Sequence, residues 1–190
     1  MSRQQREKLF NRQTRAFSEG TVESINHQWV FFDEETDEAS SLEEYLHQNV
    51  EIFRGNRWRK GCVEENGAVK HNNQIFHLQD SEQIRIRKRL IYSFERLLDE
   101  LNDDSFFQFV TTLNSLDFSV YDCLYSYNQL TFLREAKTQS GVNFFIFDNG
   151  TVLCSVQHHF YYSENEHDRF EFTLNTGKRI VIEKINSQQP

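Results

Sequence analysis

The most constraining feature of the chain is the segment 141–185, in which three turn signals separate four apolar runs. The first turn contains Asn149-Gly150, and Asn-Gly between alternating apolar runs is the strongest short-range sign of a β-hairpin. The third turn contains Gly177, and glycine adopts a positive φ without steric cost. The segment therefore predicts a C-terminal four-stranded antiparallel meander.

Before residue 88 the chain shows several short apolar runs with strand-like alternation. Turn signals such as Gly55-Asn56 and Asn66-Gly67 separate these runs, and an acidic run at 33–38 forms an expected solvated loop. Short strands expose unpaired edges unless their sheet closes on itself. We therefore predict a small SH3-like β-barrel here, with an OB-like barrel as the alternative.

Between these two regions, residues 88–116 change to a helical period. One apolar stripe with helical spacing is formed by Leu90, Ile91, Phe94, Leu97, Leu98 and Leu101, and a second by Phe106, Phe107, Val110 and Leu113. Only the polar segment 102–104 separates the two stripes, so we expect a helical hairpin. Residues 117–135 fit either a helix or a strand, and both interpretations stay open.

These segments predict an α+β protein with two domains. Residues 1–88 would form the barrel domain with a short N-terminal helix, and residues 89–190 would form the helical hairpin and the meander. The chain of 190 residues contains 18 Phe and seven Tyr. It therefore has enough apolar surface for a sizeable core.

Charge and cysteine content exclude some classes of protein. The net charge of −8 argues against a general polyanion binder, although a local basic face remains compatible with it. The three cysteines are widely spaced, so neither a disulfide framework nor a structural zinc site is expected. No apolar run approaches the roughly 20 residues that span a bilayer. We expect a cytoplasmic protein without membrane partner, metal or cofactor.

The predicted meander contains the potentially reactive side chains Cys154, His158, His159 and His167. Strand alternation points His158 and His159 to opposite faces, and it separates Cys154 from His158 by about 13 Å. That distance excludes a nucleophile–base pair. We therefore interpret Cys154 as a small core residue and His158 as a hydrogen-bonded core histidine, and we retain His159 and His167 as a possible functional surface. A metal-dependent or Cys/His enzyme centred on this sheet is the second alternative function.

A second candidate site is a basic surface on the predicted barrel. Its cationic residues are Arg54, Arg57, Arg59, Lys60, Arg85 and Arg87. Small barrels bind nucleic acids by combining cations with stacking aromatic rings, for which Trp58 is the candidate. Alternation places Trp58 opposite Arg57 and Arg59, which favours Trp58 in the core. A nucleic-acid-binding barrel is therefore the first alternative function.

No Walker loop, dinucleotide-binding glycine motif or metalloprotease motif occurs in the chain. The aromatic residues Tyr121, Tyr125, Tyr127 and Phe132 are candidates for a ligand groove, but we expect them to pack in the core. Because no pattern brings catalytic groups together, we predict no catalytic residues. The predicted function is that of a non-catalytic accessory or adaptor protein that binds another macromolecule, with a protein as the preferred partner.

Overall fold

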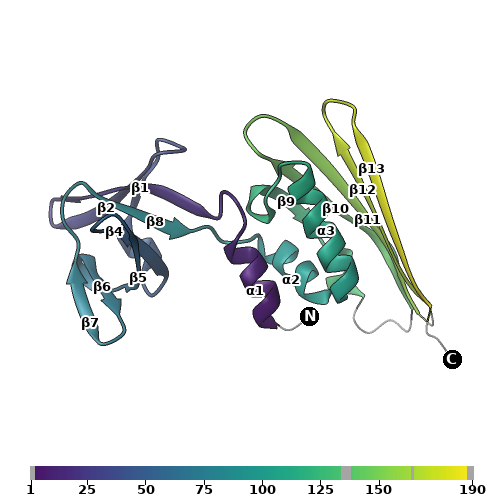
Figure 1. Cartoon of the computed structure of the whole chain (residues 1–190), viewed down its shortest axis with the longest axis horizontal. Helices are drawn as coiled ribbons and strands as arrows, with labels where there is room; N and C mark the ends of the chain where they lie inside the picture. Colours follow the sequence, from purple (N-terminus) through teal and green to yellow (C-terminus); the bar gives the residue numbers. More distant parts are fainter. Residues whose placement is uncertain (1–2, 134–137, 164, 188–190) are drawn as a thin grey trace. The chain divides into compact units, whose positions relative to one another are not determined.

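The computed structural model of the protein describes residues 3–133, 138–163 and 165–187. The chain forms two compact units (Figure 1). One, here called the β unit, consists of residues 16–88, and the other, the α+β unit, combines residues 1–15 with residues 89–190. Helices and antiparallel sheets are both present, so the α+β class is confirmed. One junction between the units follows residue 88, where the sequence also placed a domain limit.

The β unit contains one antiparallel sheet of eight strands and two short 3-10 helices. Its strands are β1 (Phe17–Ile25), β2 (Gln28–Asp33), β3 (Ala39–Ser41), β4 (Asn49–Phe53), β5 (Trp58–Val63), β6 (Ala68–His71), β7 (Gln74–His77) and β8 (Glu82–Arg87), and its helices are η1 (Leu42–Tyr45) and η2 (Glu65–Gly67). The strands follow the order β3-β2-β1-β8-β4-β5-β6-β7. The strands after β3 have four to six residues each, in agreement with the short runs of the sequence.

Turn chemistry explains the hairpins of the β unit. Asn26 and His27 both have positive φ, which a two-residue hairpin turn between β1 and β2 requires. Gly55 and Asn56 have the same conformation between β4 and β5. The hydroxyl of Ser41 accepts the Glu43 N–H and caps η1.

The closed SH3-like or OB-like barrel is not confirmed. The sheet is open, because β3 and β7 stand at the two ends of the strand order and do not pair with each other in the described residues. β3 has three residues and β7 has four. Very short edge strands limit the number of unpaired backbone groups, which is one way to protect an open sheet. The short edge strands therefore protect the open sheet, and the sheet does not need to close into a barrel.

The α+β unit pairs a five-stranded antiparallel sheet with helices. Its elements are α1 (Arg3–Asn11), α2 (Tyr92–Glu100), α3 (Asp103–Ser115), η3 (Val120–Asp122), β9 (Cys123–Tyr127), η4 (Gln129–Phe132), β10 (Gln139–Asp148), β11 (Leu153–Tyr162), β12 (Asn165–Leu174) and β13 (Arg179–Ser187). The strand order β13-β12-β11-β10-β9 confirms the predicted meander and adds β9 at its edge. Residues 117–133 thus combine 3-10 turns with one strand, and residues 134–137 lie outside the described part of the chain.

One face of this sheet packs against the helices (Figure 1). Phe109 of α3 lies at the centre, with ring centroids 5.1 Å from Phe170 and 5.8 Å from Phe172. Phe94 of α2 lies 5.4 Å from Phe145 in the same way. Each fully buried side chain of this size contributes about 1.5–3 kcal/mol. The predicted apolar stripes of α2 and α3 therefore attach both helices to the sheet.

The N-terminal helix α1 belongs to the α+β unit and not to the N-terminal domain in which the sequence placed it. The Arg6 guanidinium donates to the backbone oxygens of Leu98 and Leu101 at 2.7 and 2.8 Å and to Asp103 at 2.7 Å. The Phe10 ring packs against Phe106 at 5.8 Å. The last carbonyls of a helix lack partners within that helix. Arg6 provides hydrogen-bond donors for the carbonyls at the end of α2, and this explains where α1 docks.

We expect the substitution Arg6→Met to lower the free energy of unfolding of the α+β unit by about 1.5–3 kcal/mol, the usual contribution of a hydrogen-bonded charge. The physical reason is that the carbonyls of Leu98 and Leu101 lose a half-buried donor. Chemical denaturation followed by the helical circular dichroism signal at 222 nm measures the change. Lys8→Met, at an exposed position of the same helix, is the control and should cost less than about 0.5 kcal/mol. Equal losses in the two variants would contradict the assigned role of Arg6.

Candidate functional site

A buried polar network lies between the sheet of the α+β unit and helix α3. Its central residues, His158 of β11 and Asp168 of β12, are 0% and 1% exposed. The His158 ring stacks on Phe170, with centroids 4.2 Å apart and planes 12° from parallel. His158 is thus a hydrogen-bonded core histidine, as the sequence predicted. Buried polar groups cost free energy unless they are hydrogen-bonded, so their partners determine the chemistry of the network.

The Asp168 carboxylate accepts four hydrogen bonds. Its Oδ1 atom accepts hydrogen bonds from His158 Nε2 at 2.8 Å and from the Tyr162 hydroxyl at 2.6 Å. Its Oδ2 atom receives the Ser105 hydroxyl at 2.6 Å and Asn102 Nδ2 at 3.1 Å. Asn102 also caps α3 by accepting the Ser105 N–H. Asp168 therefore holds the N-terminus of α3 against β12, at the helix end where a negative charge is favourable.

Asn143 determines the proton positions on His158. The Asn143 Oδ1 atom accepts the Gln129 backbone N–H at 2.7 Å, which orients the amide. Its Nδ2 atom then faces His158 Nδ1 at 3.1 Å and donates to it. His158 Nδ1 is consequently an acceptor, and the proton lies on Nε2, which donates to Asp168. The network holds a neutral imidazole and an ionised carboxylate.

The pKa shifts in the network agree with this assignment. Burial lowers the pKa of His158 below its ordinary value of 6.5 and outweighs the opposing effect of Asp168. Burial tends to raise the pKa of Asp168, but hydrogen bonds from His158, Ser105 and Tyr162 lower it below 3.8 overall. The pKa of the Tyr162 hydroxyl is raised, first by burial and then by the adjacent Asp168. All three groups therefore keep one protonation state around neutral pH.

The network contains a serine, a histidine and an aspartate, but not in a catalytic order. In a hydrolase triad the histidine lies between the serine and the acid. Here Asp168 lies between them, and both nitrogens of His158 already have partners. Ser105, His158 and Asp168 are also closed off from solvent. The arrangement attaches a helix to a sheet and does not activate a nucleophile.

Two of the three cysteines are also poor nucleophiles. Cys154 is fully buried, as predicted, and burial raises the pKa of its thiol to about 11. Burial raises the pKa of the Cys123 thiol to about 12. Reactive cysteines require a lowered pKa, because the thiolate is the nucleophile. The alternative of a Cys/His enzyme finds no support at these positions.

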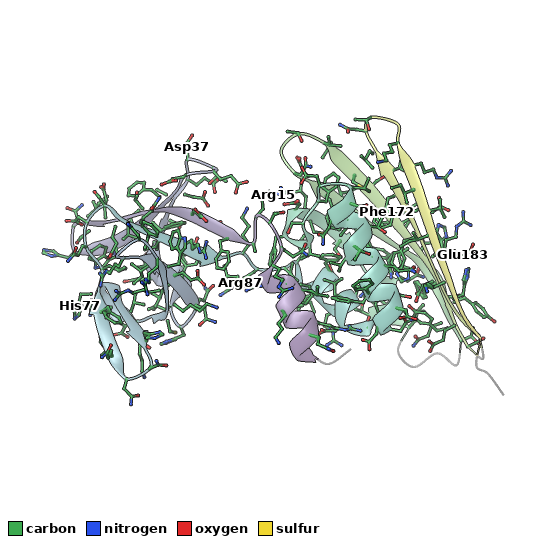
Figure 2. All side chains as sticks on the ribbon, in the orientation of Figure 1. Arg15, Asp37, His77, Arg87, Phe172 and Glu183 are labelled. Carbon is green, nitrogen blue, oxygen red and sulfur yellow. The ribbon has the colours of Figure 1, made fainter. Side chains whose placement is uncertain are left out.

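His159 and His167 lie on the opposite face of the sheet from His158 and have different acidic neighbours. His167 Nε2 lies 2.7 Å from Glu183 Oε1, and His159 Nε2 lies 3.9 Å from Glu171 Oε1. Figure 2 labels Phe172, a buried core residue of β12, and Glu183, the partner of His167 on the other face of the sheet. Hydrogen bonding by Arg179 is the main cause of the lowered pKa of Glu171. Each of the two histidines therefore lies beside a different glutamate on this face of the sheet.

Within the described residues, no three histidine, cysteine or acidic side chains gather in a way that could hold a metal ion. None of the described helices combines the length and the apolar character needed to cross a membrane.

The predicted basic surface is divided, and at least half of its cations lie beside carboxylates. Lys60 and Arg85 share one face of the β unit, where both lie next to Glu51, and Arg85 also contacts Glu19 at 3.5 Å. The guanidinium of Arg54 pairs with Glu82. Carboxylates thus already neutralise three of the six predicted cations. Nucleic-acid binding stays a prediction without support from these contacts.

Three further cations of this surface have different surroundings. Arg57 and Arg59 are exposed, and Arg87 lies 5.8 Å from the Phe17 ring. Trp58 is half-buried, and the guanidinium of Arg85 lies 4.4 Å from its indole ring. The prediction that Trp58 belongs to the core was therefore wrong. An aromatic ring covered by an ion-paired arginine is not available for base stacking.

The most unusual surface of the α+β unit is a group of exposed aromatic rings, here called the aromatic strip. It consists of Tyr125 and Tyr127 of β9, Phe132 of η4 and Phe144 of β10, with exposed fractions of 54%, 42%, 76% and 44%. Phe144 lies directly opposite Tyr127 in the sheet, and the Tyr127 and Phe132 rings stack at 6.4 Å. The prediction that Tyr125, Tyr127 and Phe132 pack in the core was therefore wrong.

The exposure of these rings depends on β9 becoming the edge strand of the sheet. Tyr121, the fourth aromatic residue of the predicted group, does pack against the core. The pattern that could have indicated the strip is the alternation of Tyr125 and Tyr127 across Ser126, which is typical of one strand face. The open choice between helix and strand at 117–135 concealed it.

Comparison with known proteins places both units in one family. Residues 4–184 match the family described as "Protein of unknown function (DUF2777)". The chain is 34% identical over 145 residues to "Uncharacterized protein YisN" of Bacillus subtilis (strain 168), and this alignment covers 76% of the chain and 72% of the relative. No solved structure matches the chain. Because the family match extends through both units, the chain belongs to the DUF2777 family.

Proposed function

We propose that the protein is a non-catalytic accessory protein that binds another protein through the aromatic strip. The observation that carries this proposal is the exposure of four adjacent aromatic side chains at the β9 edge of the sheet. Contiguous exposed apolar surface is uncommon on monomeric proteins and marks interaction sites. Tyrosine and phenylalanine are also enriched at the centres of protein interfaces.

The surroundings of the strip support a protein partner with an apolar surface. Neither β9 nor η4 contains a charged residue. The neighbouring strand β11 presents the exposed polar residues Ser155 and Gln157 beside the strip. An apolar centre with a polar border is the usual anatomy of a protein interface. An ionic or strongly polar ligand would find no complementary charge among these residues.

Two further observations agree with a non-catalytic role in the cytoplasm. The Ser105–Asp168–His158 network is sealed and is fully used in holding α3. The three cysteines Cys62, Cys123 and Cys154 are all free thiols, a state that a reducing compartment maintains.

The proposal predicts that a photo-crosslinking amino acid in place of Phe132, such as p-benzoylphenylalanine, captures one discrete protein in cells that produce this chain. Phe132 is the most exposed of the four rings at 76%, so it should lie against the bound partner. The same amino acid in place of Leu153, which is 43% exposed on β11, is the positional control and should not capture that protein. Gel shift and mass spectrometry identify the adduct.

The double substitution Tyr125→Ser and Phe144→Ser should lower the yield of this adduct about tenfold, as expected when interface aromatic residues are lost. Tyr161→Ser, at a residue of β11 that is 45% exposed, should leave the yield unchanged. Identical adducts from positions 132 and 153, or an adduct that survives the double substitution, would contradict the proposal. An adduct made of two copies of this chain would show self-association in place of binding to another protein.

A further inference from the structure

A small depression in the β unit combines an aromatic ring with two carboxylates. It is lined by Trp29, Leu42, Glu43, Leu46, Glu64 and Gly67, with His27, Gln28 and Asn66 at its border. Leu42 closes it on the core side, whereas Glu43 is exposed. The depression is open to solvent and shallow, so it suits the end of one side chain.

The position of Trp29 in the depression is fixed by the backbone of η2. A Cβ atom on Gly67 would lie 2.1 Å from the Trp29 indole nitrogen, so only glycine allows this approach. Gly67 also has a φ of +68°, and the preceding Asn66 has a φ of 58°. These left-handed conformations favour glycine and asparagine. The turn 66–67 thus forms a tight support for the edge of the indole.

The charges around the depression favour a cation. Glu43 belongs to η1 and Glu64 is the N-cap of η2, so two different turns contribute an acidic residue to the lining that Trp29 shares. Glu64 also lies 3.7 Å from the largely exposed His47, and no arginine or lysine lines the depression. The β unit as a whole contains 8 Lys/Arg and 14 Asp/Glu, a net charge of −6, so it carries most of the net charge of the chain.

We propose that this depression binds the cationic end of an arginine or lysine side chain from a basic segment of a partner protein. The cation would lie against the Trp29 indole, whose π-system attracts positive charge, and would pair with Glu43 and Glu64. An anionic group would meet two carboxylates, and a neutral group would gain nothing from them. This site belongs to a different unit from the aromatic strip, and its test does not depend on the function proposed for the strip.

The test uses a short peptide with one arginine between glycines, acetyl-Gly-Gly-Arg-Gly-Gly-amide. Its binding to the full-length protein is followed by the indole N–H resonance of Trp29 at low salt and pH 8. The chain has two tryptophans, so the signal that remains in the Trp58→Phe variant identifies Trp29. We expect a saturable shift with a millimolar Kd, and a similar shift with lysine in place of arginine. The same peptide with citrulline, which is nearly isosteric but neutral, should produce no saturable shift.

Matched substitutions test the two carboxylates. Glu43→Gln and Glu64→Gln should each weaken binding at least about fivefold, because each removes one charge from the cation. Glu65 is the next residue in the chain but does not line the depression. Glu65→Gln removes the same charge and should change the Kd less than about twofold. The proposal is overturned if the arginine peptide causes no saturable shift up to about 20 mM, a range that includes millimolar affinity. Equal binding of the citrulline peptide, or equal losses in Glu65→Gln and Glu64→Gln, would overturn it as well.

Discussion

Asp168→Ala is expected to destabilise the α+β unit by about 3 kcal/mol or more, because each buried donor left without its acceptor costs about 1–3 kcal/mol. The substitution leaves the Tyr162 and Ser105 hydroxyls and His158 Nε2 without their acceptor, in a place that solvent does not reach. It also removes the attachment of the α3 N-terminus to β12. Native proteins have about 5–15 kcal/mol of stability in total. The variant should therefore be largely unfolded at moderately raised temperature.

The two units provide separate signals for this measurement. Trp29 and Trp58, the two tryptophans of the chain, both lie in the β unit, whereas α1, α2 and α3 lie in the α+β unit. Chemical denaturation should therefore shift the helical circular dichroism transition of Asp168→Ala and leave the tryptophan fluorescence transition in place. Glu183→Ala, at an exposed residue of the same sheet, is the control and should cost less than about 1 kcal/mol. A loss below 1 kcal/mol in Asp168→Ala, or an equal shift of both transitions, would contradict this account.

The same residue shows how far sequence reasoning reaches. Along β12, Asp168 alternates in phase with Phe170, Phe172 and Leu174, all of which face the core. An acid in that phase is a visible sign of a buried polar network. Along β11, Cys154 and His158 are too far apart to interact, whereas β12 places Asp168 beside His158. Pairing between strands, which the sequence does not state directly, created the network.

Features that depend on local chemistry were predictable, and features that depend on partners distant in sequence were not. The turns at Gly150 and Gly177 have the positive φ that their sequences indicated, and the meander follows from them. The docking of α1 depends on Arg6 meeting carbonyls more than 90 residues away. The open β sheet depends on β8 entering between β1 and β4. The aromatic strip likewise depends on β9 joining β10 at the edge.

Acidification is expected to destabilise the α+β unit in two successive pH ranges. The pKa of buried His158 is lowered in the folded state from its ordinary 6.5, so below pH 6.5 the unfolded chain binds a proton that the folded chain does not. Stability then falls as the pH is lowered, by up to about 1.4 kcal/mol per pH unit for one proton. The pKa of Asp168 is lowered from 3.8, so its contribution is present above that value and is lost as the pH falls through the folded-state pKa. The unit should therefore lose stability first below about pH 6.5 and again below about pH 4.

Substitution of His158 separates these two ranges. In His158→Gln the fall in stability between about pH 6.5 and pH 4.5 should become shallower by close to one proton, while the fall below pH 4 remains, because Asp168 still titrates. His167→Gln, which alters a histidine on the opposite face of the sheet, should keep the wild-type slope between pH 6.5 and 4.5. Denaturation at 222 nm across this pH series gives the slopes, and a lower overall stability of His158→Gln does not affect the comparison. If His158→Gln retained the full wild-type slope, the imidazole would not be held neutral by the network. The assignment of its proton to Nε2 would then have to be abandoned.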